Sequence, residues 1–478
     1  MPSTDVPAED TEDYAALRSR KLRLLIPLIV AVGFMMEQLD STIITTAIPD
    51  IALSLRVTPL QMNLAITSYI LSLAVFIPIS GWIADRYGSR RVFAAAMLIF
   101  TIGSMLCGVA ESLPMLVATR VLQGFGGAMM TPVGRLVLIR AFPRSELVTA
   151  MTYMTVPAVI GPTIGPLLGG FLTTYANWRW IFYVNVPVGL LGFALALRYV
   201  DDVRAKGLGQ FDVKGFLLAG IALALLQLGL ENVGHPMIGR PAIAGLFAGS
   251  VLLMYGYTRY ARIRRDPALD LTLFSIRTFR ISTMAGGISR IGVNAVPFML
   301  PLLFQIGFGL SPIQSGSLTF VTSVGTLAVK PISGTLLRQF GFRGVLIGNG
   351  VLCAVVIAAF ALVQASTPHW IVFLHVLLFG IVRSTQFMTT NTLTYADTPA
   401  SKLSRSTSLG SVIQQLTVSF GVSVGAALLG VIAGAGNLPS VHDFHLAFLT
   451  VAVIVLLSSP GFLPLKPEDG AHVSGYKR

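Results

Sequence analysis

The feature that most constrains this chain is a series of long apolar segments that recurs along almost its whole length. A membrane-spanning helix needs about 20 mostly apolar residues, and by that criterion the sequence contains fourteen such segments. They lie at about 24–51, 62–83, 91–110, 114–138, 148–172, 178–198, 213–232, 241–260, 281–305, 312–336, 343–364, 369–394, 407–433 and 444–464. The sequence therefore predicts an all-α membrane protein with fourteen transmembrane helices.

Composition excludes the other classes of protein. Only 12% of the 478 residues are charged and 54% are hydrophobic, whereas a soluble protein has about 25% charged residues. The 47 glycines and 26 prolines lie within the apolar runs, unlike those of a disordered chain. The net charge of +13 does not indicate nucleic acid, because the basic residues flank apolar segments and form no stripe with aromatic residues. Cys107 and Cys353 each lie inside an apolar run and give no sign of a disulfide.

The distribution of Lys and Arg predicts the orientation in the membrane. Cytoplasmic segments carry an excess of these residues. If the N-terminus is cytoplasmic, 26 of the 34 basic residues fall on that side, five lie inside spans, and only Arg56, Arg179 and Arg240 fall on the other side. We therefore expect both termini in the cytoplasm and an even number of spans.

Two turns of the sequence indicate an internal repeat. Residues 81–91 and 334–343 share a glycine, a charged residue four positions later, a second glycine at seven and an arginine at nine. Related halves around a central cavity are common in secondary transporters. The predicted organisation is a cytoplasmic acidic and basic tail (1–23), a six-helix bundle (24–198), two inserted transmembrane helices (199–265), a second six-helix bundle (266–465) and a cytoplasmic tail (466–478).

The first of these turns has the residues of a conformational latch. Asp85 lies at a predicted helix end beside several arginines, and a carboxylate there can accept charge-assisted hydrogen bonds or cap a neighbouring helix. The alternative is a solvated loop that carries only the positive charge of a cytoplasmic segment. The predicted latch residues are Gly81, Asp85, Arg86, Gly88, Arg90 and Arg91.

Glycines recur at helical spacing in the segment 148–172. Gly161, Gly165 and Gly169 are four residues apart and so line one helix face, where small residues allow another helix to approach closely. Pro166, like Pro162, removes a backbone donor and bends the helix, and Gly170 extends the motif. The motif is compatible with a bendable seal of a cavity or with ordinary helix packing.

Ionisable residues inside membrane spans are costly and usually functional. Here they are Glu37, Asp40, Arg120, Arg135, Arg290, Lys330 and Arg383. Glu37 and Asp40 are three residues apart and share a helix face. Burial favours the protonated form of a carboxyl group, so both are candidates for proton coupling, with Asp40 ranked first. The alternative is that Asp40 forms a permanently ionised structural pair with Arg120.

The remaining polar residues in the spans predict a substrate cavity. Arg120 and Gln123 share a face of their span, and Asn294 and Asn391 add polar groups to two spans of the second half. Arg290, Lys330 and Arg383 have no acidic residue near them within the spans. This balance favours anionic or zwitterionic substrates, unless the cations pair with helix C-terminal carbonyls. We predict no metal site, although His442, Asp443 and His445 lie close together in sequence.

Several motifs in order resemble those of the major facilitator superfamily. The turn 81–91 resembles its hallmark loop, residues 116–128 resemble its membrane-embedded arginine motif, and residues 161–170 resemble its antiporter motif. Residues 39–49 and 178–189, together with fourteen spans, resemble the EmrB/QacA-type drug:proton antiporters. Residues 298–312 and 386–397, and Arg135 with its neighbours, resemble the MdtD-like branch of that family most.

The resemblance implies a major facilitator fold of two six-helix bundles plus two inserted helices. It implies a secondary transporter of the bacterial inner membrane, not an enzyme, which uses the proton gradient and no cofactor to export drugs or other small organic compounds. An exporter of an organic anion such as a carboxylate is the alternative, and a receptor that does not transport is a third. We expect a monomer in the lipid bilayer that binds a small-molecule substrate, with a periplasmic adaptor protein as a further partner to test.

Overall fold

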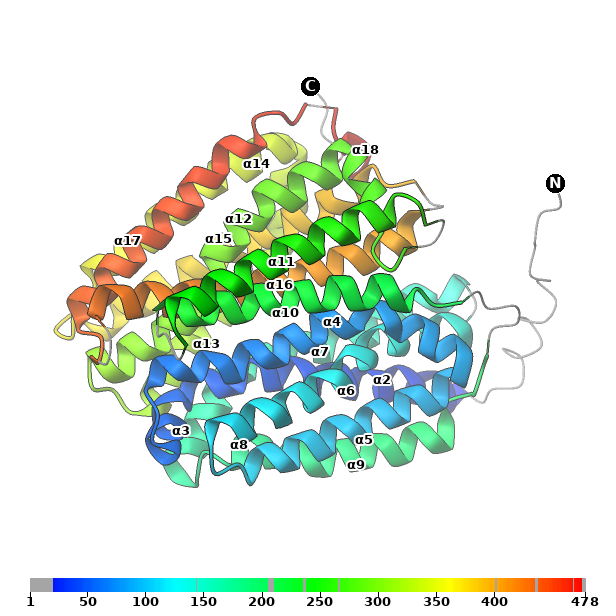
Figure 1. Ribbon diagram of the computed structural model, residues 1–478, viewed down its shortest axis with the longest axis horizontal. Coiled ribbons are helices and arrows are strands. Elements are labelled where there is room, and N and C mark those ends of the chain that lie inside the picture. Colours follow the sequence, from blue (N-terminus) through cyan, green and yellow to red (C-terminus); the bar gives the residue numbers. More distant parts are fainter. Residues whose placement is uncertain are drawn as a thin grey trace.

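The computed structural model is helical throughout the residues it describes, which are 20–142, 144–204, 210–234, 238–264, 267–399, 402–434, 437–466 and 468–474 (Figure 1). The predicted tail residues 1–19 and 475–478 lie outside the described part. In Figure 1 the first part of the chain forms the lower half of the molecule and the last part forms the upper half. The helices of the upper half rise towards the right relative to those of the lower half.

Each half of the chain supplies a set of long helices. The first half contains α2 (Arg20–Ile43), α3 (Ile48–Leu55), α4 (Asn63–Tyr87), α5 (Ser89–Gly108), α6 (Leu113–Ala141), α7 (Arg144–Tyr175), α8 (Trp180–Tyr183) and α9 (Asn185–Tyr199). Next come α10 (Val213–Gly234) and α11 (Arg240–Ala261). The second half contains α12 (Arg277–Leu302), η4 (Leu303–Gly307), α13 (Pro312–Ala328), α14 (Lys330–Ala359), α15 (His369–Ala396), α16 (Leu403–Ala433), α17 (Val441–Ser458) and α18 (Ala471–Ser474).

Side-chain caps fix where several of these helices begin. Ser311 and Ser440 form capping boxes with Gln314 and Asp443 at the starts of α13 and α17. Ser112 accepts a hydrogen bond from the backbone of α6. A capping residue satisfies backbone N–H groups that the first turn of a helix leaves free. These helices therefore begin within a few residues of the predicted positions 114, 312 and 444.

Most predicted spans fall on single helices, but several are divided, among them 178–198, which is split at Val184 into α8 and α9. The segment 24–51 is not one helix, because α2 ends at Ile43 and a short 3₁₀ turn leads into α3. The segment 312–336 breaks after Ala328, and α14 then runs through the non-helical Gly341 into the next predicted span. Eleven helices in the described residues are long and apolar enough to cross a membrane. The remaining predicted spans fall on α6, α7 and α13, so the total of fourteen stays a prediction.

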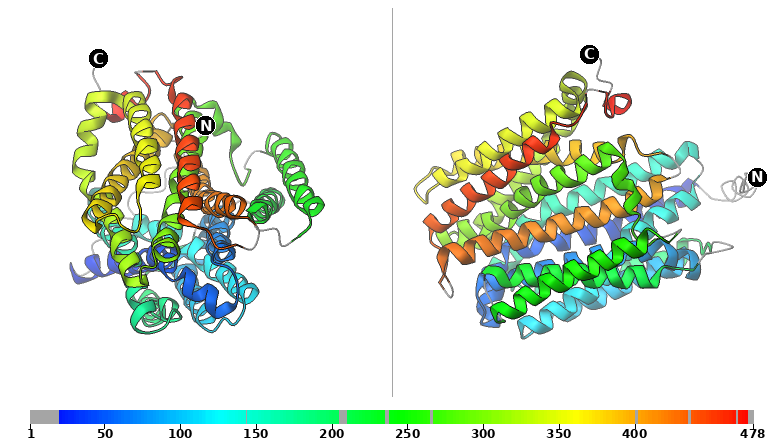
Figure 2. Two further views of the ribbon diagram at one scale, coloured as in Figure 1. Left: turned by 90° about the vertical axis from the view of Figure 1, so that its left-hand side faces the viewer. Right: turned by 45° about the horizontal axis from the view of Figure 1, so that its top comes forward.

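The two halves meet along two pairs of helices. Within the first half, α2 packs on α7, and α6 packs on both α4 and α5. Within the second half, α12 packs on α16, and α15 packs on both α13 and α14. Contacts between the halves join α7 to α13 and α4 to α16. Figure 2 shows these two groups of helices from two further directions.

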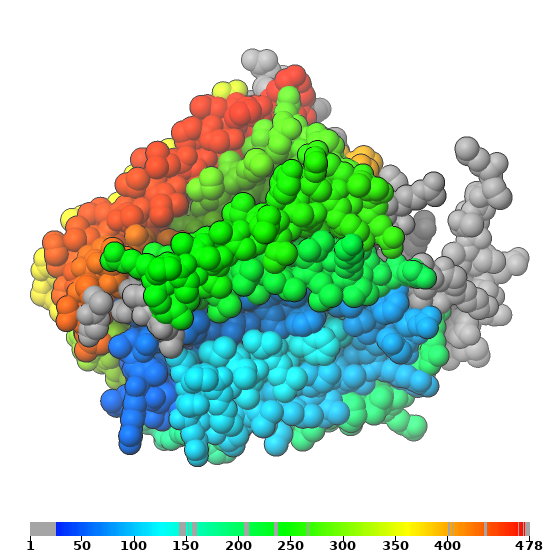
Figure 3. All heavy atoms as spheres, in the orientation of Figure 1, coloured from blue at the N-terminus to red at the C-terminus, as the bar shows by residue number. Residues whose placement is uncertain are grey.

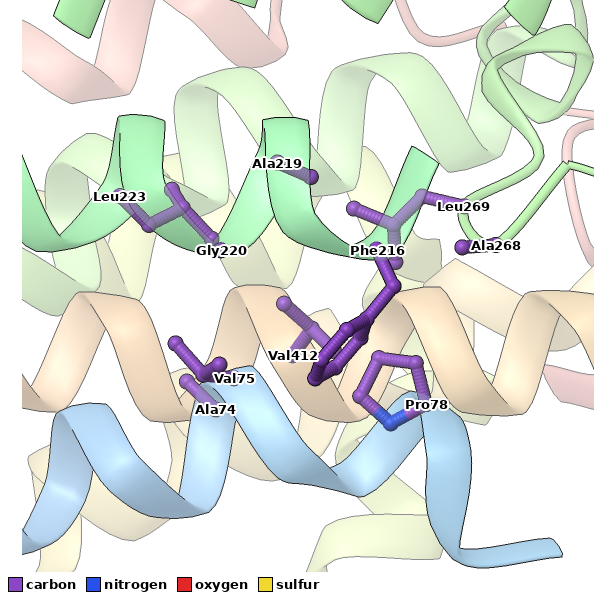
Figure 4. Close-up of a pocket in the computed structure, with 10 residues that line it drawn as sticks. All are labelled: Ala74, Val75, Pro78, Phe216, Ala219, Gly220, Leu223, Ala268, Leu269 and Val412. Atoms are coloured by element: carbon purple, nitrogen blue, oxygen red, sulfur yellow. The ribbon is translucent and has the colours of Figure 1, made fainter. Parts of the chain in front are cut away.

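The pair α10 and α11 lies outside both groups, beside the junction of the halves (Figure 2). α10 packs on α11, on α4 of the first half and on α16 of the second. In Figure 3 the two helices lie across one face of the molecule, between its lower and upper halves. Figure 4 shows Phe216 of α10 extending towards Val75 and Pro78 of α4, where the packing leaves a cavity of only about 10 Å³.

The two turns of the sequence repeat share an unusual backbone conformation. Gly88 has a φ of 100° and Gly341 has a φ of 61°, values that residues with a side chain rarely adopt. Gly81 and Gly334, the first glycines of the two turns, have open space around the position of a side chain. The repeat that the sequence indicates therefore has a counterpart in the backbone.

Candidate functional site

Asp40 and Arg120 form an ion pair inside the first half. Arg120 Nη1 lies 2.5 Å from Asp40 Oδ2, and both side chains are completely buried. Asp40 is near the end of α2, and Arg120 is in the first third of α6. A buried arginine without a carboxylate partner would carry a large desolvation penalty, so the pair explains how α6 tolerates this residue.

Neutral side chains complete the surroundings of the ion pair. Gln123 Nε2 and Asn185 Nδ2 donate to Asp40 Oδ1 over 2.8 and 3.2 Å. Arg120 also donates to Gln123 Oε1 and to the carbonyl of Ala65, at 2.8 and 3.1 Å. Its guanidinium lies 4.2 Å from the centre of the Tyr69 ring. The carboxylate thus accepts hydrogen bonds from the side chains of Arg120, Gln123 and Asn185.

Glu37 has different surroundings from Asp40, although both lie on α2. Its carboxyl group is 6% exposed and accepts a short hydrogen bond from the hydroxyl of Thr131 on α6. Among the described residues no Lys or Arg forms an ion pair with it. Arg135 acts on this carboxyl group only at longer range, without an ion pair. Glu37, ranked second from the sequence, thus lacks the direct counter-charge that Asp40 has.

The second half contains two arginines around one aromatic ring. The guanidinium of Arg290 on α12 lies 5.3 Å from the centre of the Phe387 ring, and that of Arg383 on α15 lies 5.7 Å from it. Arg290 Nη2 donates to Asn391 Oδ1 at 2.5 Å. The Nε atoms of both arginines and Nδ2 of Asn294 are buried without a hydrogen-bond partner. All three free atoms are donors.

Lys330 does not join this group. Its side chain is exposed at the start of α14, and among the described residues it forms no hydrogen bond or ion pair. The sequence placed Lys330 with Arg290 and Arg383 as a third cavity cation. The structure brings together the two arginines, Asn391 and Phe387, and leaves Lys330 out.

The glycine motif of α7 makes close contacts on two sides. A Cβ atom added to Gly165 would lie 2.1 Å from Thr42 Oγ1 of α2, and one added to Gly169 would lie 2.3 Å from the carbonyl oxygen of Ile43. Gly161 faces α2 in the same way. A Cβ atom on Gly170 would instead lie 2.4 Å from the carbonyl oxygen of Pro312 on α13. The predicted close approach of helices is confirmed.

The α7 motif also meets the second half through its prolines. A Cβ atom added to Gly316 of α13 would lie 2.3 Å from the carbonyl oxygen of Pro166. Ser323 Oγ donates to the carbonyl of Pro162 at 3.2 Å. The motif is therefore part of the contact between the two halves.

The predicted latch turn is held by residues of its own half. Asp85 forms an ion pair with Arg140 of α6, not with the neighbouring arginines of the turn. Arg91 pairs with Asp202 at 3.1 Å, and Gly88 lies so close to Asp202 that a Cβ atom would be 2.1 Å from Oδ1. Arg86 is exposed and Arg90 is partly buried. Asp85 thus accepts a charge-assisted hydrogen bond, as its position suggested, but from Arg140 of α6, and its role as a conformational latch stays a prediction.

Sequence reasoning missed several residues that the structure places at these sites. Thr131, Arg140 and Phe387 are the partners of Glu37, Asp85 and the two arginines. Asn185 was part of a recognised motif but was not assigned to the Asp40 site. Only the i, i+4 spacing of Arg383 and Phe387 was a usable signal, since the other partners come from helices distant in sequence.

Comparison with known proteins gives a consistent result. The model of the Major Facilitator Superfamily matches residues 30–422. A protein of Serratia proteamaculans, named as a candidate multidrug resistance protein MdtD, is 41% identical over 440 residues, which cover 91% of this chain and 92% of the relative. A protein of the same name from Pectobacterium atrosepticum is 41% identical over 444 residues, which cover 92% and 95% of the two chains.

Solved structures share the fold at much lower identity. A D-xylose–proton symporter aligns with a TM-score of 0.66 at 14% identity and covers 93% of this chain and 98% of its own. The nucleoside transporter NupG aligns with a TM-score of 0.65 at 12% identity, covering 92% and 99%. At this identity the two structures are evidence of the fold alone.

Proposed function

Because the chain belongs to the major facilitator superfamily, we propose that this transporter is a proton-coupled antiporter that exports drugs or other small organic compounds by alternating access. The names of the curated relatives support multidrug export. The excess of Lys and Arg in one set of turns supports placement in the bacterial inner membrane with both termini in the cytoplasm. The proton gradient is the proposed energy source.

The observation that carries the proposal is the difference between the two acids of α2. Asp40 has Arg120 as a directly bonded counter-charge, whereas Glu37 accepts a hydrogen bond from Thr131 and has Arg135 only at longer range. A permanently paired carboxylate cannot easily take up a proton, because protonation would leave the arginine buried and uncompensated. We therefore assign proton exchange to Glu37, and to the Asp40–Arg120 pair the positioning of α2 against α6.

The helix contacts supply a route from proton exchange to movement. Glu37 is on α2, and the glycine face of α7 packs on the same helix. α7 in turn contacts α13 of the second half through Gly170 and Pro166. Protonation of Glu37 changes a charge on α2 and so biases the position of α7 against α13. In this mechanism a proton taken from the outer side accompanies the outward release of substrate.

Reconstituted liposomes test the proposal. The probes are ethidium, an organic cation, and fluorescein, an organic anion, and the readout is proton movement caused by each dye. We expect dye-driven proton flux in the wild type and none in Glu37→Gln, which still binds dye. Glu111→Gln is the matched control, because Glu111 is exposed between α5 and α6. Undiminished proton flux in Glu37→Gln would rule out the assigned role.

A second candidate function is the export of organic anions. It is favoured by the unpartnered donor atoms of Arg290, Arg383 and Asn294, which form no ion pair with a described acid. Such a donor-only group suits a carboxylate or a similar anion. The comparison of ethidium with fluorescein separates the two candidates: only the anion should cause proton flux if the transporter exports anions.

A further inference from the structure

A third buried acid within the predicted spans, Glu231, lies in the last turn of the inserted helix α10. The prediction of intramembrane acids omitted it. Its side chain is 8% exposed, and Gln227, one turn earlier, is 2% exposed. Gln227 Nε2 and Ser423 Oγ of α16 donate to Glu231 Oε1 over 2.6 and 2.7 Å. Glu231 therefore lies where the inserted pair meets the second half.

The polar atoms that remain free around Glu231 are suited to accepting hydrogen bonds. Glu231 Oε2 and Gln227 Oε1 are buried and have no partner with good hydrogen-bond geometry, although the Thr67 hydroxyl lies close to the carboxyl group. No Lys, Arg or His of the described residues forms an ion pair with Glu231. A buried carboxylate without a counter-charge is costly. The group is thus complementary to a positive charge or an added proton.

Glu231 also lines one end of a groove of about 430 Å³ between α10, α4 and α6. In Figure 3 the groove lies on the face shown, below α10. The residues of α10 that line it run from Phe216 to Glu231, a length of about 22 Å at 1.5 Å per residue. Its volume is within the range of sites that hold drug-sized molecules.

The groove has one polar end and one apolar end. Thr67, Gln227 and Glu231 lie at the polar end with their polar atoms largely buried, whereas Val75, Phe76 and Phe216 line the other end, and most of the groove surface is apolar. An elongated molecule with a polar head and an apolar body would match both ends. The residues that line the groove include no Lys, Arg or His.

The hydroxyl groups that line the groove have no free donor for the anionic headgroup of a ligand. Thr67, Ser68 and Ser72 already donate to the carbonyls of Asn63, Ala65 and Val121. A phosphate or sulfate group needs free donors, and the groove offers none from these hydroxyls. A phospholipid headgroup, which carries a phosphate, is therefore a poor match, whereas an ammonium group meets only acceptors.

We propose that this groove binds an amphipathic organic monocation, with its charged head at Glu231 and its apolar body along α10. The site is separate from the Asp40 and Arg290 sites, and the proposal does not depend on proton-coupled export. The inserted helix pair would then have a role of its own, because α10 supplies both the acid and one apolar wall.

Binding measurements in phosphatidylcholine nanodiscs test this site without a proton gradient. The probes are dodecyltrimethylammonium, dodecanol and dodecyl sulfate, which share a chain and differ in head charge, with empty nanodiscs as the background. We expect the cation to bind the wild type at least about tenfold more tightly than the other two. Glu231→Gln should remove this preference and leave the affinity for dodecanol unchanged. Equal binding of the three probes, or an unchanged preference in Glu231→Gln, would overturn the proposal.

A chemical measurement checks that the probe is at Glu231. Dicyclohexylcarbodiimide adds to a protonated carboxyl group and, after rearrangement, leaves an N-acylurea that mass spectrometry detects. Glu231 is the only acid in residues 215–240, so modification of that peptide reports on it alone. Dodecyltrimethylammonium should slow the modification and dodecyl sulfate should not. Equal protection by both probes would contradict the charge selectivity.

Filling the groove provides a second variant that keeps the acid. Ala224→Phe, in the middle of the groove, should weaken binding of dodecyltrimethylammonium by about tenfold. Ala242→Phe on the exposed side of α11 makes the same change elsewhere in the inserted pair and should leave binding as in the wild type. If both variants bind like the wild type, the probe does not lie in the groove.

Discussion

Asp40 of α2 and Arg120 of α6 form an ion pair at 2.5 Å, and neither side chain has any exposed surface. The pair joins the helix that carries both candidate proton-coupling acids to the helix that carries the arginine motif. Because the pair has no contact with solvent, each of its two charges needs the other as its counter-charge. This dependence determines what single substitutions at either position will do.

Removal of only one member of the pair should destabilise the protein. Asp40→Asn leaves the guanidinium of Arg120 buried without a counter-charge, and breaking a buried pair in this way costs about 3–5 kcal/mol. The measurement is the thermal unfolding temperature of the purified transporter in detergent. Loss of transport in Asp40→Asn would by itself say little about proton coupling.

The double variant Asp40→Asn with Arg120→Gln separates charge pairing from proton exchange. It removes both charges and keeps side chains of similar size, so much of the lost stability should return. If proton exchange occurs at Glu37, the double variant should keep some dye-driven proton flux. A double variant that is as stable as the wild type and has no flux would assign the exchange to Asp40.

The contact between α7 and α13 leads to a prediction about conformation. In Gly170→Ala the added Cβ atom would lie 2.4 Å from the carbonyl oxygen of Pro312. The conformation described here should therefore lose stability relative to a conformation in which α7 and α13 separate. A shift of about 1.4 kcal/mol changes the ratio of the two conformations tenfold. The measurement is the distance distribution between spin labels on α7 and α13.

Gly245→Ala is the matched control for Gly170→Ala. Gly245 of α11 has no atom within 4 Å of the added Cβ position, so the same substitution should leave the distance distribution unchanged. An unchanged distribution in Gly170→Ala as well would mean that the contact does not determine which conformation is populated.

The sequence predicted local features of the fold better than contacts between segments that are distant in sequence. Apolar runs gave the positions of most helices, because this signal lies within the segment that it predicts. The spacing of Gly161, Gly165 and Gly169 gave a helix face that does pack closely on α2. The break of α13 after Ala328 was missed, although Pro331 in the first turn of α14 is a local sign of a helix start.

Partners of charged residues were much harder to predict. The sequence offered Arg86, Arg90 and Arg91 as neighbours of Asp85, but Arg140 reaches it from a helix that begins after the next span. Glu231 was omitted although it lies at the end of a predicted span, since nothing local indicated that α10 would pack on Ser423 of α16. Contacts between distant segments depend on helix packing that apolar periodicity does not specify.

The turn between α4 and α5 gives a prediction about backbone strain. Gly88→Ala would hold alanine at a φ of 100° and place its Cβ atom against Asp202. The left-handed conformation costs about 1–2 kcal/mol for a residue with a side chain, and the close contact adds to this. Gly81→Ala, with open space in the same turn, should cost less. Equal unfolding temperatures for the two variants would contradict the prediction.

The two arginines around Phe387 give a prediction about substrate charge. Arg290→Gln and Arg383→Gln each remove a free donor and a positive charge next to Asn391 or Phe387. A hydrogen bond to a charged group contributes about 1.5–3 kcal/mol, so each variant should weaken fluorescein binding by at least about tenfold and affect ethidium little. Lys330→Gln is the matched control, because it removes a positive charge from an exposed side chain. The measurement is dye binding in reconstituted vesicles. If the arginine variants lose only ethidium binding, the anion-export candidate is wrong. If Lys330→Gln loses as much fluorescein binding as the arginine variants, the effect comes from net charge and not from this pair.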